Sequence, residues 1–307
     1  MKIHLNSAKE NWVVDRFREE WYKYNSSIST KIIRNSDIVW IISPWTWKKI
    51  NKKILSKKKV ICSIYHLDED KFDEKQLDEF NLRDEYVDFY HVISENTKKQ
   101  IKKLTNKPIV SIPFWVNQEI WKDINEKDIL REKYKLDLDS YLIGSFQRDT
   151  EGKDLISPKL SKGPDQFIKK IKEYKEKNKK IGVILAGKRR NFIIENLERL
   201  DIPFNYFEMV DFKELNELYN CLDLYIVSSR YEGGPQAVME CAITRTPIIS
   251  TDVGVASEIL HPNSIFSMNS FMNAKPNTDY AYEKVQKYLI PNGFENFRKI
   301  INQVYEN

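Results

Sequence analysis

One stretch, residues 228–250 (SSRYEGGPQAVMECAITRTPIIS), constrains the fold more than any other part of the chain. It continues from the apolar run 222–227 (LDLYIV), which is typical of a buried strand. Gly233 and Gly234 then permit unusual backbone dihedrals, and Pro235 fits the first position of a helix whose apolar residues recur at helical spacing. The sequence therefore predicts a strand, a glycine-rich loop and a helix, which is a building unit of α/β sheets.

Two glutamates belong to this stretch, Glu232 in the loop and Glu240 inside the predicted helix. A carboxylate accepts hydrogen bonds from vicinal hydroxyls, so the pair favours a ligand with two polyol parts. The junction lies at the carboxyl end of a strand, where a helix N-terminus attracts anionic ligands. The alternative is that Glu240 is a solvated helix residue and Glu232 an acid of the turn, with no ligand.

The Glu-x7-Glu spacing around Gly-Gly-Pro resembles the signature of retaining GT-B glycosyltransferases, specifically family 4 (glycosyl transferases group 1). Residues 214–229 (ELNELYNCLDLYIVSS), 246–250 (TPIIS) and the Gly-x-x-x-Glu turn at 254–258 extend the resemblance. In that turn Val255 stands where the family often has a second glycine. The resemblance implies an α/β protein with two Rossmann-like domains, whose parallel sheets face each other across a cleft, and an N-terminal domain reduced in size.

Two cations upstream match the family's diphosphate-binding pair. Arg148 follows an apolar run at 142–146, and Lys162 precedes a predicted helix. The resemblance implies that they neutralise the leaving nucleoside diphosphate, whose charge grows as the glycosidic bond breaks. The segment between them, DTEGKDLISPKLS, is longer than usual for the family. An exposed arginine and a helix-start lysine without a ligand are the alternative.

His66 follows the buried run VICSIY, where family members often place a histidine beside the transferred sugar. The alternative is a loop histidine with no ligand, whereas His91, inside FYHVIS, is expected to be a satisfied strand residue. The expected catalytic residues are Arg148, Lys162, Glu232 and His66. The expected donor-binding residues, with Glu240 on the ribose hydroxyls, are Gly233, Gly234, Pro235, Gln236, Glu240, Gly187, Lys188 and Val210.

The resemblance also implies the reaction, which is transfer of a hexosyl group from a nucleoside-diphosphate sugar with retention of configuration. The departing phosphate would accept the acceptor's proton. We expect no cofactor and no divalent metal, because the Asp-x-Asp pattern at 137–139 lies in a connecting segment. The rival interpretations are glycoside hydrolysis by the two glutamates, a hydrolase or epimerase acting on nucleotide sugars, and a catalytically silent sugar-nucleotide-binding protein.

Strands and helices alternate along the whole chain, which implies parallel sheets. Expected N-terminal elements include a strand at 2–5 and helices at 12–24 and 48–55. The segment PFWVNQEIW resembles the family's hinge, with Phe114 and Trp115 in place of Asn and Gly. We therefore expect three segments. They are an acceptor-side domain over 1–117, a nucleotide-sugar domain over 118–290 that begins with a connecting helix within 118–140, and a final helix at 291–307 that returns to the first domain.

The N-terminal part is the basic one, since residues 1–116 hold 22 Lys plus Arg against 16 Asp plus Glu. The lysines of Lys48–Lys59 alternate with apolar residues, which suits peripheral contact with an anionic membrane or simply a solvated helix face. No nucleic-acid-binding module accompanies them, so no nucleic-acid partner is expected. The chain has no long apolar run and no apolar leader, and Cys62, Cys221 and Cys241 suit buried free thiols. We expect a cytoplasmic protein, peripheral at the inner face of the membrane or free, that glycosylates a glycan or lipid-linked acceptor in surface polysaccharide or lipopolysaccharide assembly.

Overall fold

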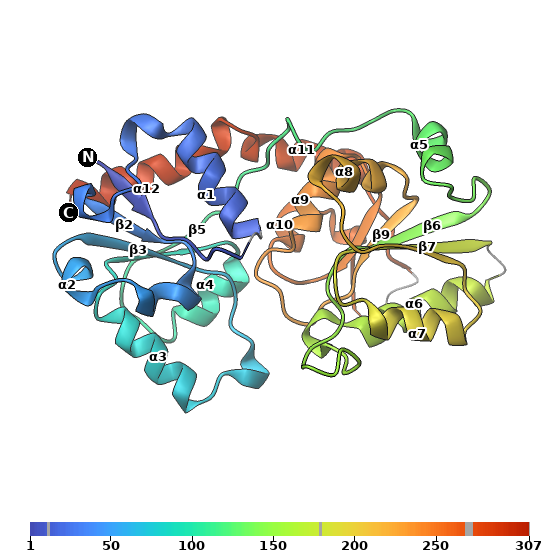
Figure 1. The fold of residues 1–307 in the computed structure, drawn as a ribbon, viewed down its shortest axis with the longest axis horizontal. Helices are drawn as coiled ribbons and strands as arrows, with labels where there is room; N and C mark the ends of the chain where they lie inside the picture. Colours follow the sequence, from blue (N-terminus) through green and yellow to red (C-terminus); the bar gives the residue numbers. More distant parts are fainter. Residues whose placement is uncertain (11–12, 178–179, 268–272, 307) are drawn as a thin grey trace. The chain divides into compact units, whose positions relative to one another are not determined.

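The computed structural model describes residues 1–10, 13–177, 180–267 and 273–306, and the chain divides into two compact units (Figure 1). Unit 1 comprises Met1–Trp115 with Ile290–Asn307, and unit 2 comprises Val116–Leu289. The boundaries expected from the sequence, after residues 117 and 290, lie within two residues of these. The two ends of unit 2 pair with each other, because Val116 forms a parallel bridge with Leu289.

Unit 1 is built on a parallel sheet with the strand order β1-β2-β3-β4-β5. Its strands are β1 (Ile3–Leu5), β2 (Ile38–Ile41), β3 (Lys59–Ile64), β4 (Phe89–Val92) and β5 (Ile109–Ser111). An isolated parallel bridge joins Ile3 to Ser29, so the chain passes beside β1 before it crosses to β2. The chain therefore reverses direction across the sheet at β1, and such a switch point is where open α/β sheets bind ligands.

The helices of unit 1 cover both faces of this sheet. They are α1 (Val13–Tyr24), α2 (Lys52–Leu55), α3 (Glu74–Asp84), α4 (Glu95–Ile101) and α12 (Glu295–Glu306). Helices α1 and α12 lie on one face, and α2, α3 and α4 lie on the other (Figure 1). Alternate side chains of a strand point to opposite faces. Accordingly, Trp40 packs in the cluster with α1 and α12, while Val39 and Ile41 pack in the opposite cluster.

The aromatic residues of the PFW segment belong to the core of unit 1. Phe114 stacks on Phe17 of α1 with ring centroids 4.3 Å apart. The Trp115 indole Nε1 donates a hydrogen bond of 2.8 Å to the buried carboxylate of Glu20. The departure from the family's hinge pattern thus places two large aromatic side chains against α1.

The helix predicted over residues 48–55 is wrong. A 3-10 helix, η3 (Pro44–Lys49), is followed by Ile50 in an extended conformation, and α2 spans only Lys52–Leu55. Asn51 is the N-cap of α2, a position that its short polar side chain favours over a helix interior. The lysines of Lys48–Lys59 therefore do not share one amphipathic helix.

His91 is a satisfied strand residue, as the sequence predicted. The ring is buried in β4, with Nδ1 2.8 Å from Ser63 Oγ and Nε2 2.8 Å from the Ile112 carbonyl oxygen. A carbonyl oxygen only accepts, so Nε2 carries the proton and Nδ1 accepts from the serine hydroxyl. Ser63 in turn accepts from Trp40 Nε1 at 2.8 Å. This network is complete only with a neutral imidazole.

The stability of unit 1 is expected to fall in mild acid because burial lowers the pKa of His91 to about 4. The unfolded chain binds a proton below about pH 6.5 whereas the native state does not, so the contribution is full above pH 6.5 and is lost by about pH 4. The loss is about 3 kcal/mol. Denaturant unfolding of the wild type and of His91→Gln between pH 7.5 and 4.5 measures it. Equal pH dependence of the two proteins would contradict the prediction.

Unit 2 is built on a second parallel sheet, of six strands in the order β11-β10-β9-β6-β7-β8. Its strands are β6 (Tyr141–Ser145), β7 (Ile181–Ala186), β8 (Phe204–Phe207), β9 (Leu224–Val227), β10 (Ile248–Thr251) and β11 (Ile265–Phe266). From β6 the chain moves to β7 and β8 on one side, then returns to β9 on the other side. The strand order therefore reverses between β6 and β9.

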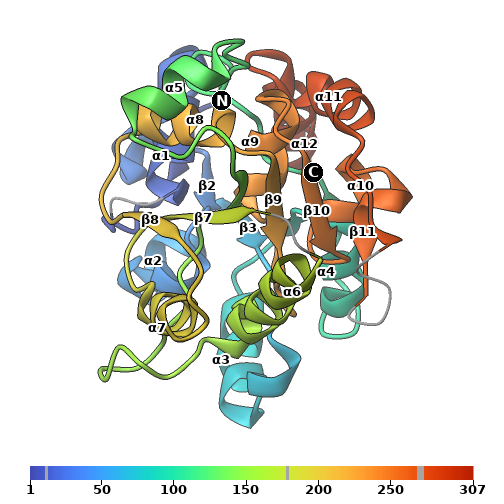
Figure 2. The same cartoon turned by 90° about the vertical axis from the view of Figure 1, so that its right-hand side faces the viewer.

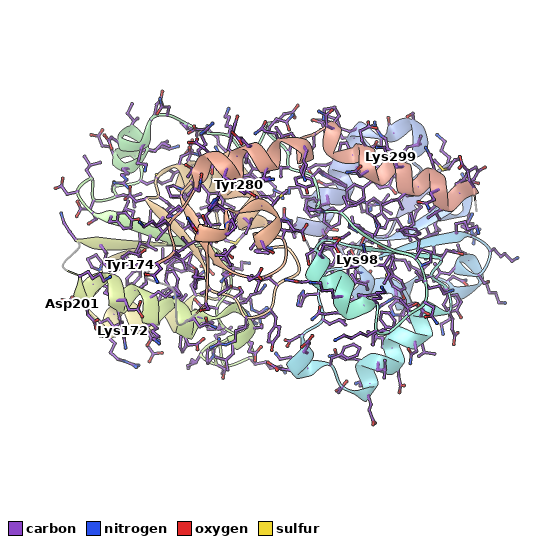
Figure 3. The ribbon with its side chains drawn as sticks, turned by 180° about the vertical axis from the view of Figure 1, so that it is seen from behind. Lys98, Lys172, Tyr174, Asp201, Tyr280 and Lys299 are labelled. Atoms are coloured by element: carbon purple, nitrogen blue, oxygen red, sulfur yellow. The ribbon has the colours of Figure 1, made fainter. Side chains whose placement is uncertain are left out.

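Helices cover both faces of the second sheet. They are α5 (Lys127–Lys133), α6 (Pro164–Glu176), α7 (Asn191–Arg199), α8 (Phe212–Asn220), α9 (Gln236–Ile243), α10 (Ala256–Ile259) and α11 (Thr278–Val285). Helices α6 and α7 lie on one face, and α8 and α9 lie on the other (Figure 2). Tyr174 of α6, which Figure 3 labels, stacks on Tyr141 of β6 with ring centroids 6.0 Å apart. The connecting helix predicted within 118–140 is short, since only α5 forms there.

Two observations bear on other expectations. The three cysteines, Cys62, Cys221 and Cys241, are buried free thiols, as the sequence predicted. Over the described ranges, none of the helices is long and apolar enough to cross a bilayer.

Candidate functional site

The candidate site of unit 2 lies at the carboxyl edge of its sheet. Parallel strands end at the same edge, and open α/β sheets bind ligands beyond that edge where the strand order reverses. In unit 2 this point is flanked by the loop that follows β6 and the loop that follows β9. These loops carry Arg148 and Lys162 on one side and Glu232 on the other, so the topology alone brings the expected cations and the loop acid together.

Glu232 and Lys162 form an ion pair through Oε1 and Nζ. The side chain of Glu232 is 10% exposed and that of Lys162 is 22% exposed. The Ser229 hydroxyl also donates to Glu232 Oε1, at 3.2 Å. The Gln147 amide donates to the Lys162 carbonyl oxygen at 3.0 Å. A fixed carboxylate and a fixed ammonium group are therefore held within one polar cluster that can hydrogen-bond hydroxyl groups and neutralise phosphate.

The two loops are joined through their main chains at Gly163, the N-cap of α6. Gly163 has φ of +61°, and a Cβ atom there would lie 1.8 Å from the Ser228 carbonyl oxygen. The Ser228 hydroxyl donates to the Gly163 carbonyl oxygen at 2.8 Å. The Arg230 amide also donates to the Ser161 carbonyl oxygen, at 2.8 Å. Only glycine permits this approach, which fixes Lys162 beside the β9 loop.

Replacing Gly163 by alanine is expected to lower the free energy of unfolding of unit 2 by at least ~2 kcal/mol, because strain from a positive φ adds to a clash with main chain. Gly152→Ala is the control. Gly152 also has a positive φ of +77°, but a Cβ there meets only the Asp154 side chain, at 3.2 Å. Its cost is expected to be about 1 kcal/mol. Denaturant unfolding compares the two variants, and equal losses would contradict the role given to the Ser228 contact.

The long segment between the two cations folds back on itself as a hairpin. Thr150 forms an antiparallel bridge with Pro158, and the Lys159 amide donates to the Asp149 carbonyl oxygen at 2.7 Å. The Lys162 amide then donates to the Lys159 carbonyl oxygen at 2.8 Å. The residues between the two cations thus form a hairpin that is closed at its base, so Arg148 and Lys162 stay at the same edge of the sheet.

Arg148 itself is exposed just after β6. Its Nε donates to the Thr150 carbonyl oxygen at 2.6 Å, which holds the side chain against the base of the hairpin. Partial desolvation and the nearby Arg189 guanidinium lower the pKa of Arg148. A guanidinium stays charged in proteins, so Arg148 adds a permanent positive charge to this edge of the sheet.

The Gly-Gly-Pro corner is shaped by a second close contact. Gly254, in the turn after β10, has φ of +54°, and a Cβ there would lie 2.5 Å from the Gly233 carbonyl oxygen. Gly234 follows in the same corner, with its amide nitrogen 2.9 Å from that Cβ position. The sequence placed Pro235 at the first helical position; in the structure it is the N-cap, and α9 begins at Gln236.

Glu240 is buried on α9. The Tyr219 hydroxyl donates to Glu240 Oε2 at 2.9 Å, and burial together with this carboxylate raises the pKa of Tyr219. The alternative that Glu240 is a solvated helix residue is therefore wrong, because its carboxylate is buried and bonded to Tyr219.

The remaining donor-binding candidates of unit 2 follow β7 and β8. Gly187 has φ of +87°, and its amide donates to the Phe207 carbonyl oxygen at 3.0 Å. Lys188 is exposed, and Val210 is partly buried against the core cluster that contains Tyr219. All of them lie at the same carboxyl edge as the loops after β6 and β9.

His66 lies in unit 1, exposed after β3. The same unit has a shallow hollow of about 250 Å³ beside its own switch point at β1. It is lined by His4, Asn6, Ser7, Ile33, Thr46, Lys49, Ile50, Asn51 and Ile54. Within the described part of the chain, no three His, Cys, Asp or Glu side chains are grouped so that they could hold a metal ion.

Sequence reasoning missed four residues of this region: Gln147, Lys159, Arg190 and Ser229. Gln147 and Ser229 come just after β6 and β9, and this position at strand ends could have predicted them as site residues. Lys159 lay in a segment interpreted only as a departure from the family. Arg190 follows Lys188 and Arg189, a charge run typical of an exposed loop, yet it is fully buried.

Comparison with known proteins agrees with this architecture. Residues 156–306 match the family described as glycosyl transferases group 1. No curated protein matches the sequence.

Three solved structures are similar in fold. HepE of Anabaena, solved with UDP-glucose, has 11% identity and a TM-score of 0.75 over 98% of this chain and 99% of its own. The sucrose-phosphate synthase of Thermosynechococcus elongatus has 15% identity and a TM-score of 0.69 over 95% of this chain and 76% of its own. The lipopolysaccharide outer core galactosyltransferase WaaB has 13% identity and a TM-score of 0.66 over 99% of both chains. The chain thus has the GT-B fold, and its residues 156–306 are similar to the glycosyl transferases group 1 family.

Proposed function

We propose that this protein is a family 4 glycosyltransferase that moves a hexosyl group from a nucleoside-diphosphate sugar to a glycan or lipid-linked acceptor, with retention of configuration. The observation that carries the proposal is the polar cluster at the switch point of unit 2, where Lys162 and Glu232 form an ion pair beside Arg148. The family match covers Lys162, Ser229 and Glu232 but not Gln147 or Arg148. UDP is the first candidate nucleotide, because HepE was solved with UDP-glucose.

The charges of the cluster suit the departing group. As the glycosidic bond breaks, electrons move onto the β-phosphate, so fixed cations stabilise the transition state more than the ground state. Arg148 and Lys162 supply this charge in the proposal, without a divalent metal. The Glu232 carboxylate would accept hydrogen bonds from the hydroxyls of the transferred sugar, and the main-chain amides of Gly233 and Gly234 would donate to them.

Two further assignments complete the donor site. Glu240 would accept hydrogen bonds from the ribose hydroxyls, with Tyr219 holding its carboxylate in place. Gly187, Lys188 and Val210 would border the base, since they follow the neighbouring strands at the same edge. Pro235 and Gln236 would direct the N-terminus of α9 toward the phosphates.

Unit 1 would bind the acceptor, with His66 beside the transferred sugar. In the retaining reaction that we propose, the departing phosphate accepts the proton of the acceptor hydroxyl on the face from which it leaves. The setting that we propose is assembly of a surface polysaccharide or lipopolysaccharide. The exposed side chains of Lys48, Lys49, Lys52, Lys53 and Lys57 would contact the anionic inner face of the cytoplasmic membrane.

Incubation with a panel of UDP-, GDP- and ADP-sugars, with and without candidate acceptors, tests the proposal. Release of the nucleoside diphosphate that rises only when an acceptor is present supports transfer. Release without an acceptor would instead support a nucleotide-sugar hydrolase, and binding without turnover would support a silent binding protein. The anomeric configuration of the product, read by NMR, tests retention.

A further inference from the structure

The 148–162 hairpin carries a third cation, Lys159, beside the two that the proposed donor site uses. Its amide is bonded to the Asp149 carbonyl oxygen and its carbonyl oxygen accepts from the Lys162 amide, at 2.7 and 2.8 Å. The main chain therefore fixes Lys159 between the residue that follows Arg148 and Lys162 itself. The position of Lys159 beside Asp149 depends on how the hairpin closes, whereas its position beside Lys162 follows from the local turn.

The side chain of Lys159 is half-buried among like charges. Burial lowers the pKa of its ammonium group, and Lys162 and Arg148 lower it further, more than Glu232 and Glu151 raise it. Among the residues with described positions, no carboxylate lies within ion-pair distance of Lys159, whereas Lys162 is paired with Glu232. A partly desolvated ammonium group with two cationic neighbours is unfavourable unless an anion binds there.

A count of charges gives the kind of anion. The charged groups that act on Lys159 are the cations Lys162 and Arg148 and the acids Glu232 and Glu151, so together with Lys159 itself they carry a net positive charge. A nucleoside diphosphate carries at least two negative charges and several acceptor oxygens. The ion pair with Glu232 offsets part of the charge of Lys162, so Lys159 adds positive charge that such a ligand can use.

We propose that Lys159 binds the diphosphate group of the donor as a third phosphate-binding residue, supplied by the 148–162 hairpin. The proposal rests on the donor site described above and adds a residue to it. Lys159 contacts the phosphates directly, so its contribution is present with the nucleoside diphosphate alone and absent with the nucleoside.

Isothermal titration of UDP, GDP and ADP into the wild type identifies the diphosphate that binds most tightly, which is then compared with its uncharged nucleoside. Lys159→Ala is expected to weaken the diphosphate about 10- to 100-fold, as for a lost hydrogen bond to a charged group, and to leave nucleoside affinity unchanged. Lys159→Arg is expected to keep most of the affinity. Lys153→Ala removes an equal charge from the exposed tip of the same hairpin and is the matched control.

Lys162→Ala separates the two proposals. Weaker diphosphate binding in Lys162→Ala, together with wild-type binding in Lys159→Ala, would overturn the role of Lys159 and leave the donor site intact. Wild-type binding in both variants, or no binding of any diphosphate by the wild type, would overturn the donor site and the inference with it. An equal loss of nucleoside and diphosphate affinity in Lys159→Ala would show a structural effect and would also overturn the inference.

Discussion

Replacing Lys162 by alanine is expected to lower the rate of sugar transfer at saturating donor about 100- to 1,000-fold. This corresponds to about 3 kcal/mol of transition-state stabilisation. The effect should fall mainly on kcat, because the diphosphate gains charge as it leaves and the ammonium group interacts with that charge more strongly than with the bound donor. Lys162→Arg keeps the positive charge and should recover part of the loss.

The control for this measurement is Lys172→Ala. Lys172 lies on the exposed side of α6, the helix that begins just after Lys162 (Figure 3). Its removal changes the net charge of the protein equally but leaves the site unchanged. Steady-state kinetics with the donor and acceptor found active in the panel compares the variants. A Lys162→Ala enzyme as fast as Lys172→Ala would exclude Lys162 from catalysis.

The strands that were predicted best are those with continuous apolar runs. LDLYIV and KVICSIY gave β9 and β3, because a parallel strand covered by helices on both faces has few positions for a polar residue. Alternation of strands and helices also predicted parallel sheets, and in unit 2 the carboxyl ends of the paired strands β6 and β9 lie at the same edge. That topological rule, rather than any local signal, is why the pairing of Lys162 with Glu232 lay within reach of the sequence.

The sequence predictions failed where a capping residue interrupted a helical pattern, or where hydrogen bonds to residues far along the chain determined a position. The helix expected over 48–55 is interrupted at Ile50 and Asn51. The Asn51 side chain accepts a hydrogen bond from the Lys53 amide, and this cap starts a separate helix, α2. The placement of Lys159 depends on hydrogen bonds that close the hairpin. Neither apolar periodicity nor motif spacing carries that information.

The burial of Arg190 was equally out of reach from the sequence. A run of basic residues after a strand is usually a solvated loop, and an arginine is buried only where several acceptors converge on it. Three of those acceptors come from a distant part of the chain: Ser145 at the end of β6, and Gln147 and Asp149 after it. Only the folded sheet brings them together.

Replacing Arg190 by methionine is expected to lower the free energy of unfolding of unit 2 by about 3 to 5 kcal/mol. Arg190 is 0% exposed, and its Nε donates to Asp149, itself 1% exposed, at 3.0 Å. Burial raises the pKa of Asp149 and lowers that of Arg190, and their mutual attraction opposes both shifts. Removal of the guanidinium therefore leaves a buried carboxylate without its counter-charge.

Two further variants distinguish this cause from a simple loss of packing. Arg199→Met removes an exposed arginine that pairs with Glu195 on α7 at 2.9 Å, and it should change stability by less than about 0.5 kcal/mol. Arg190→Met combined with Asp149→Leu removes both buried charges, so part of the loss should be recovered. Denaturant unfolding of the four proteins provides the comparison. A double variant less stable than Arg190→Met would contradict the buried-charge explanation.

The same substitution should also weaken nucleotide binding at temperatures where the variant is still folded. Arg190 donates to the carbonyl oxygens of Gln147 and Ala186, so it ties the end of β6 to the end of β7, and its partner Asp149 is at the base of the hairpin. Without these bonds the cations of the hairpin lose their fixed positions, and electrostatic stabilisation depends on groups that are already oriented before charge develops. We therefore expect Arg190→Met to weaken diphosphate binding although Arg190 is fully buried, whereas Arg199→Met should bind as the wild type does. Wild-type affinity in folded Arg190→Met would show that the hairpin keeps its shape without this buried link.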